Sequence, residues 1–155
     1  MGYGWVIFKR ESIVAQGFGM FAQRKNATSC ISEYLALIEG LEALADLRVQ
    51  FAPVEIRGDA KSVINQMQGF TRINSTVIRN LQRQALKIAK HFNQLSWAWI
   101  PRRENRYADM LSRHAVVQTG ATSGKPTHLL NQAQSKLFTS GRLIPLMDLR
   151  VYTNG

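Results

Sequence analysis

The sequence predicts an α/β domain, in which helices pack on a β-sheet, and three observations support this fold class. The chain has 155 residues, 45% of them hydrophobic, which is enough for one domain with a real core. Along the chain, the hydrophobic residues switch between the alternation of strands and the wider spacing of helices. The resulting order is β-β-α-β-α-α-β-α, then a linker and a last strand, which is typical of a layered α/β fold.

The first two strands are predicted to form an antiparallel hairpin. Apolar and β-branched residues fill 4–8 and 13–22, and a short polar break separates the two runs. From Ile31 onward, apolar residues recur at helical spacing, and Thr28 or Ser29 precedes them as a candidate N-cap. A helix therefore follows the hairpin.

The middle of the chain alternates between strand and helix. Pro53 limits a strand to the later part of 49–57, and this strand ends at Gly58-Asp59. The spacing then predicts helices over 60–68 and 76–92, a strand over 95–100 and a helix over 106–116. The apolar face of the longer helix is predicted to comprise Val77, Leu81, Ala85, Ile88 and Phe92, and the core is expected to include Trp97 and Trp99.

The last part of the chain has a different composition. Residues 117–141 are rich in Gly, Ser, Thr, Gln and Asn, which is typical of a linker, with one helical turn expected near 129–137. Alternation returns near the end as a strand. We therefore expect three regions, which are a core over 1–116, a linker over 117–145 and a C-terminal strand over 146–155.

The charge of the chain favours a polyanionic partner. Twenty Lys and Arg against ten Asp and Glu give a formal charge of +10. The single cysteine, Cys30, excludes an internal disulfide framework and a cysteine-rich zinc site. The sequence has no apolar run long enough to cross a bilayer and lacks a signal-peptide layout. We therefore expect a soluble, cytoplasmic protein that does not bind membranes.

Acidic residues are scarce after residue 59, so the few that remain attract attention. Residues 60–155 carry 14 basic and 3 acidic side chains, a net charge of +11. Glu33 and Asp109 are predicted in the first turns of helices, and Asp59 follows a strand end. Carboxylates in such places can converge at one edge of a sheet, where they suit a hard cation such as Mg²⁺. The alternative is that each one only complements a helix N-terminus.

Four segments carry a resemblance to a known family. They are residues 32–44 (SEYLALIEGLEAL), 54–67 (VEIRGDAKSVINQM), 99–112 (WIPRRENRYADMLS) and 2–7 (GYGWVI). In order and spacing, these segments resemble the first-helix, strand-Asp-helix, last catalytic and second-strand motifs of ribonuclease H type 1. The resemblance covers residues 2–116 and implies a ribonuclease H-like mixed five-stranded sheet flanked by helices.

The first strand of that family, which carries an Asp-Gly pair, is absent from the N-terminal side of the hairpin. Residues 148–155 (DLRVYTNG) resemble it, with Asn154 in place of the Asp. The C-terminal strand is therefore expected to complete the sheet, as in a circular permutation. It would do so within one chain or by a swap between two chains in a homodimer, and the alternative is a chance match with a frayed tail.

The resemblance also implies a chemistry. Four residues match the family's catalytic metal ligands: Glu33, Asp59, Asp109 and Asn154. In the family, such ligands hold two Mg²⁺ or Mn²⁺ ions, and the enzyme uses these ions to hydrolyse the RNA strand of RNA–DNA hybrids. Asn154 is neutral, so cleavage is expected to be impaired. The alternative is a catalytically inactive module of the same fold that binds structured nucleic acid or a ribonucleoprotein.

Three groups of residues are candidates for binding the nucleic acid. Thr28, Ser29 and Cys30 align with the family residues that contact the RNA 2′-hydroxyl and bases. Arg102 and Arg103 precede the last motif. A basic face on the helix over 76–92 matches the family's basic handle or, alternatively, is only a solvated surface; it comprises Arg79, Arg83, Lys87 and Lys90, with Arg72 ahead of it.

Overall fold

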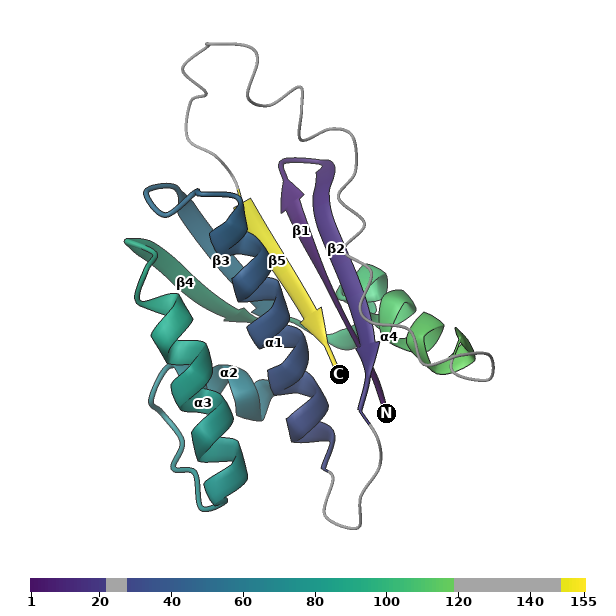
Figure 1. Cartoon of the computed structure of the whole chain (residues 1–155), viewed down its shortest axis with the longest axis vertical. Helices are drawn as coiled ribbons and strands as arrows, with labels where there is room; N and C mark the ends of the chain where they lie inside the picture. The colour runs from purple at the N-terminus through teal and green to yellow at the C-terminus, as the bar shows by residue number, and fades with distance from the viewer. Residues whose placement is uncertain (22–27, 119–148) are drawn as a thin grey trace.

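The computed structural model describes residues 1–21, 28–118 and 149–155 (Figure 1). It has five strands, β1 (Gly2–Lys9), β2 (Ser12–Met20), β3 (Pro53–Gly58), β4 (Gln94–Trp99) and β5 (Leu149–Asn154). The helices are α1 (Ser29–Asp46), α2 (Lys61–Met67), α3 (Thr76–Ala89) and α4 (Arg106–Gln118), with a 3-10 turn, η1 (Arg102–Glu104), before the last helix. The predicted α/β fold class is confirmed.

The C-terminal strand lies at the centre of the sheet. The strand order is β2-β1-β5-β3-β4, so β5, drawn in yellow in Figure 1, separates β1 from β3. It pairs antiparallel with β1, where Asn154 faces Gly4, and parallel with β3, where Thr153 faces Gly58. β5 therefore joins the β1–β2 hairpin to the β3–β4 pair. This strand begins at Leu149, and residues 146–148 lie outside the described residues.

Helices cover the two faces of the sheet unequally. Side chains of β1 alternate between the faces, so that Trp5 and Ile7 join the main core with α1, whereas Val6 contacts Ala108 and Leu111 of α4. α3 packs against α1, and α4 packs against β1 and β2 on the opposite face (Figure 1). The sheet is therefore a middle layer, with its larger core on the α1 side.

Two predictions about α1 change. The helix begins at Ser29 and not at Ile31, so Glu33 lies in its second turn and not in its first. Thr28 occupies the N-cap position, but its side chain makes no capping hydrogen bond. The early start adds only Ser29 and Cys30, and helix ends shift by one or two residues without a change in hydrophobic spacing.

Two predictions about buried residues are wrong. Val77 is 55% exposed, and Ile78 takes the buried place at the start of α3. Trp99 is 47% exposed at the end of β4, whereas Trp97 packs against the main core as predicted. Both errors lie in the terminal turn or last residue of an element, where one face is no longer covered by a neighbour.

The predicted linker over 117–145, with its helical turn near 129–137, falls largely outside the described residues; α4 extends to Gln118. In the parts of the chain that the structure describes, no helix combines the length and the apolar character that a bilayer span requires.

Candidate active site

Asp59 and Asn154 meet at the ends of two parallel strands. β3 and β5 run side by side, so the residue after β3 and the last residue of β5 arrive at the same edge of the sheet. The Asn154 side-chain amide donates to Asp59 Oδ2 at 3.1 Å. Asn154 is almost fully buried, whereas Asp59 is partly exposed. The structure thus joins two of the four predicted site residues directly.

Asn105, which the sequence analysis did not single out, holds the other side of Asp59. Its Nδ2 donates to Asp59 Oδ1 at 3.0 Å and to the carbonyl of Thr153 at 2.8 Å. It is only 1% exposed and sits between η1 and α4. Asn105 therefore ties the last motif to both β3 and β5. The sequence feature that could have indicated Asn105 is its position within segment 99–112, which resembles the last catalytic motif of the family.

Glu33 approaches the same edge from α1. Gly155 follows β5 and packs so closely on α1 that a Cβ there would collide with the backbone of Ser32 and Glu33. Burial raises the pKa of Glu33 to about 8, and the negative charge of Asp59 acts in the same direction. A hydrogen bond from the Gly155 backbone and the positive charge of Arg102 oppose this increase. Buried Glu33 therefore lies beside the end of β5 and within electrostatic reach of Asp59, which Asn154 contacts.

Asp109 lies in the first turn of α4 and is held by two arginines. Arg102 donates through Nε at 3.0 Å and through a terminal nitrogen at 2.7 Å, both to Asp109 Oδ1. Arg113, one turn further along α4, forms an ion pair with Asp109 Oδ2 at 2.8 Å. Within residues 1–21, 28–118 and 149–155, no three His, Cys, Asp or Glu side chains are grouped so that they could hold a metal ion. Asp109, a predicted metal ligand, is therefore paired with Arg102 and Arg113 and not with the other predicted ligands.

The predicted substrate-binding residues lie on three elements. Thr28 and Ser29 are exposed at the start of α1, and Cys30 is half-buried beside them, where burial raises the pKa of its thiol. Arg102 and Arg103 are exposed in η1, and Arg102 donates to the carboxylate of Asp109. Arg79, Arg83 and Lys87 of the basic face are exposed on α3, which lies beside α1 (Figure 1). Lys90 is exposed directly after this helix, and Arg72 is exposed ahead of it.

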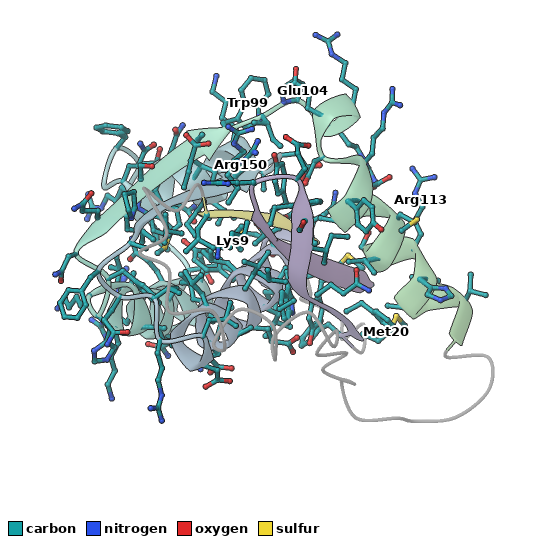
Figure 2. The ribbon with its side chains drawn as sticks, turned by 90° about the horizontal axis from the view of Figure 1, so that it is seen from above. Lys9, Met20, Trp99, Glu104, Arg113 and Arg150 are labelled. Atoms are coloured by element: carbon teal, nitrogen blue, oxygen red, sulfur yellow. The ribbon has the colours of Figure 1, made fainter. Side chains whose placement is uncertain are left out.

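Trp99 is a site neighbour that was predicted to be in the core. Its indole N–H donates to the backbone carbonyl of Asp59 at 3.1 Å, and the Lys61 ammonium lies 5.6 Å from its ring centroid. Figure 2 shows Trp99 and Glu104 at the same edge of the molecule. The tryptophan therefore fixes the backbone of Asp59 while its ring stays half exposed.

The chain is similar to a known family over most of its length. The sequence profile of the family described as "Reverse transcriptase-like" matches residues 2–115. A bifunctional protein of Mycobacterium tuberculosis is 29% identical over 134 residues, which are 83% of this chain. The chain spans only 35% of the length of that curated relative.

Solved structures share the fold. The crystal structure of RNase H1 from the halophilic archaeon Halobacterium salinarum is 33% identical, has a TM-score of 0.67, and the match covers 76% of this chain and 86% of that one. LC11-RNase H1, solved in complex with an RNA/DNA hybrid, has a TM-score of 0.71 at 24% identity, over 77% of this chain and 88% of that one. The mixed five-stranded sheet with its helices is therefore the one seen in RNase H structures.

Proposed function

The chain belongs to the reverse transcriptase-like family and has a ribonuclease H-like fold, and from this premise we propose that it is a ribonuclease H-type endonuclease. Its substrate would be the RNA strand of an RNA–DNA hybrid. The observation that carries the proposal is the convergence of Glu33, Asp59 and Asn154 at one sheet edge, with Asp109 entering on α4. The hybrid bound by the structural relative supports the choice of substrate.

The proposed cofactor is Mg²⁺ or Mn²⁺, as two ions. The donor set fits hard cations, because it consists of carboxylate and amide oxygens. The negative charge of Asp59 disfavours the ionised form of Glu33, and a cation bound to both carboxylates would relieve this repulsion. Glu33, Asp59 and the Asn154 oxygen would hold one ion, and Asp109 would be needed for the second. Bound ions would supply an activated water and stabilise the leaving oxygen.

Asn154 makes the arrangement weaker than a set of four carboxylates. A carboxylate at this position would face Asp59 with like charge and would favour a cation between the two. The amide instead donates to Asp59, and it adds no negative charge to the site. We therefore propose that this chain binds its substrate and cleaves it slowly.

A second candidate function is favoured by the same contact. If the Asn154–Asp59 hydrogen bond replaces the ion, the fold would serve as a nucleic-acid or ribonucleoprotein binding module without cleavage. Its basic surface would remain useful, because phosphate contacts need no catalysis.

We propose in addition that the chain is a circular permutation of the family fold. The support is the position of β5, which is last in the sequence and central in the sheet. Its antiparallel pairing with β1, in which Asn154 faces Gly4, is the pairing expected if the first strand of the family fold follows the rest of the domain in the sequence.

Cleavage of a hybrid with a labelled RNA strand tests the function. With Mn²⁺ or Mg²⁺, the Asn154→Asp chain is expected to cleave at least tenfold faster than the chain with asparagine, because it restores a charged donor beside Asp59. The matched control is Asn154→Asp combined with Asp59→Asn, which has the same net charge as the original chain but reverses the pair. Binding of the hybrid by both forms without cleavage by either would favour the binding module.

A further inference from the structure

We propose that Arg102 and Arg113, the arginine pair, keep Asp109 from a divalent ion until nucleic-acid phosphates draw the arginines away. Metal and hybrid would then strengthen each other's binding. The inference deepens the proposed function and rests on it for the identity of the hybrid. It concerns a contact that the catalytic assignment leaves unexplained, since one expected metal ligand is fully engaged by cations of the chain itself.

Both oxygens of Asp109 are occupied. Arg102 places two nitrogens on Oδ1, at 2.7 and 3.0 Å, and Arg113 places one on Oδ2, at 2.8 Å. The Asp109 carboxylate is 13% exposed, so the two arginines cover most of it. Its backbone N–H is bonded to the carbonyl of Asn105, which fixes the helix start. An ion could reach this carboxylate only after at least one arginine has left.

The arginines are positioned to leave. The side chain of Arg102 is 67% exposed and that of Arg113 is 72% exposed, and Figure 2 shows Arg113 projecting from α4 at the molecular surface. An exposed arginine is cheap to move, because its ion pair is already weakened by water. A phosphate offers the same bidentate geometry as a carboxylate, so a bound strand would compete for each guanidinium.

Arg102 is also a resident cation of the whole site. Its hydrogen bond to Asp109 raises the pKa of the guanidinium, and the charges of Asp59 and Glu33 act in the same direction. Arg102 therefore interacts electrostatically with the carboxylates of Asp109, Asp59 and Glu33. When a phosphate takes up Arg102, the site loses a neutralising charge, and its affinity for a divalent ion increases. By linkage, the ion increases the affinity for the phosphate by the same factor.

The experiment measures Mn²⁺ binding by electron paramagnetic resonance, with and without an RNA–DNA hybrid. The original chain is expected to bind Mn²⁺ on the order of tenfold more tightly when the hybrid is present. In the Arg102→Gln and Arg113→Gln double variant, Mn²⁺ is expected to bind more tightly without hybrid, and the gain from hybrid is expected to shrink below about threefold. A gel of the recovered RNA shows whether the hybrid stayed intact.

A matched control removes the same charge from two arginines away from the site. Arg10, at the turn of the β1–β2 hairpin, and Arg48, after the end of α1, are both exposed. Replacing both with Gln is expected to leave the metal affinity and the coupling close to those of the original chain. Equal effects in the two double variants would show a general charge effect and would overturn the proposal. So would unchanged Mn²⁺ affinity in the Arg102 and Arg113 variant, provided that its circular dichroism spectrum matches that of the original chain.

The outcomes separate this inference from the proposed function. If the original chain binds no hybrid, the proposed function fails, and the metal titration without hybrid still tests whether the arginines exclude the ion. If the hybrid binds normally and the Mn²⁺ affinity changes neither on adding hybrid nor on replacing the arginines, the proposed function stands and the arginine pair does not control metal binding.

Discussion

Asp59 accepts hydrogen bonds on both sides from neutral amides, which add no positive charge to that of the nearby Arg102. Asn105 donates to one oxygen and Asn154 to the other. Neither brings a positive charge, so the field of Asp59 reaches Glu33, which is already buried against β5 and Gly155. Hydrogen bonds therefore hold Asp59 between Asn105 and Asn154, while the charges of Asp59 and Glu33 disfavour one another. Such a balance is expected to show in the stability of the protein without metal.

Replacing Glu33 with Gln should change the pH dependence of folding. The folded-state pKa is raised from 4.5 to about 8, so folding favours the protonated carboxyl. This favourable contribution is present below the ordinary pKa and is lost as the pH rises through about 8. In chelator, Glu33→Gln is expected to match the original chain at about pH 5 and to exceed its free energy of unfolding by about 2–4 kcal/mol at about pH 9.

Urea denaturation at several pH values provides the measurement for this prediction. The control is Glu104→Gln, which removes an exposed carboxylate in η1 and leaves Glu33 and Asp59 unchanged. Its stability curve should run parallel to that of the original chain. A difference between Glu33→Gln and the original chain that stays constant with pH would show that the burial of Glu33 does not govern its ionisation.

At the level of elements, hydrophobic spacing was sufficient for the strands and helices but not for their ends. The hairpin, β3, β4 and α4 appear close to their expected places, because each buries a continuous apolar face. Val77 and Trp99 were misassigned because spacing cannot tell where the covering neighbour stops. Three site positions came from the family resemblance together with the scarcity of acids. The roles of Asn105 and Arg113 depend on contacts between segments, which no local pattern encodes.

The exposed basic face of α3 is expected to make hybrid binding depend on the salt concentration. If Arg79, Arg83 and Lys87 contact phosphates, replacing all three with Gln removes the release of their counterions on binding. Hybrid binding is then expected to weaken at low salt, and the slope of log affinity against log salt to become shallower by about 2. Fluorescence anisotropy with a labelled hybrid over a range of salt concentrations measures both.

The control for the basic face removes the same charge elsewhere. Lys9 and Arg10 lie at the turn of the β1–β2 hairpin, and Arg48 lies after the far end of α1 from Glu33. Changing these three residues to Gln should leave the salt slope near that of the original chain. Equal slopes in the two triple variants would assign the basic face of α3 to solvation alone.

Over the whole molecule, the sheet is held together by its last strand. β5 makes both the antiparallel contact to β1 and the parallel contact to β3, so without it the hairpin and the β3–β4 pair would not meet in one sheet. Val151 and Leu149 are buried in the main core from this strand, and Asn154 contacts Asp59 at the site. Stability and the site therefore depend on the same segment, although it lies far along the chain from its partners.

A rearranged chain tests whether this connection matters for the fold. Residues 146–155 are placed ahead of Gly2 through a loop of about four residues, and residues 117–145 are removed. Because Asn154 already faces Gly4 in an antiparallel pair, the new loop closes a hairpin without altering the sheet. The rearranged chain is expected to fold with the same circular dichroism spectrum and to gain about 1–2 kcal/mol, since a shorter connection costs less entropy to close. A chain that simply lacks residues 146–155 serves as the control and is expected to lose cooperative unfolding. Loss of folding in the rearranged chain, or full stability in the shortened one, would show that β5 is not the strand that completes this sheet.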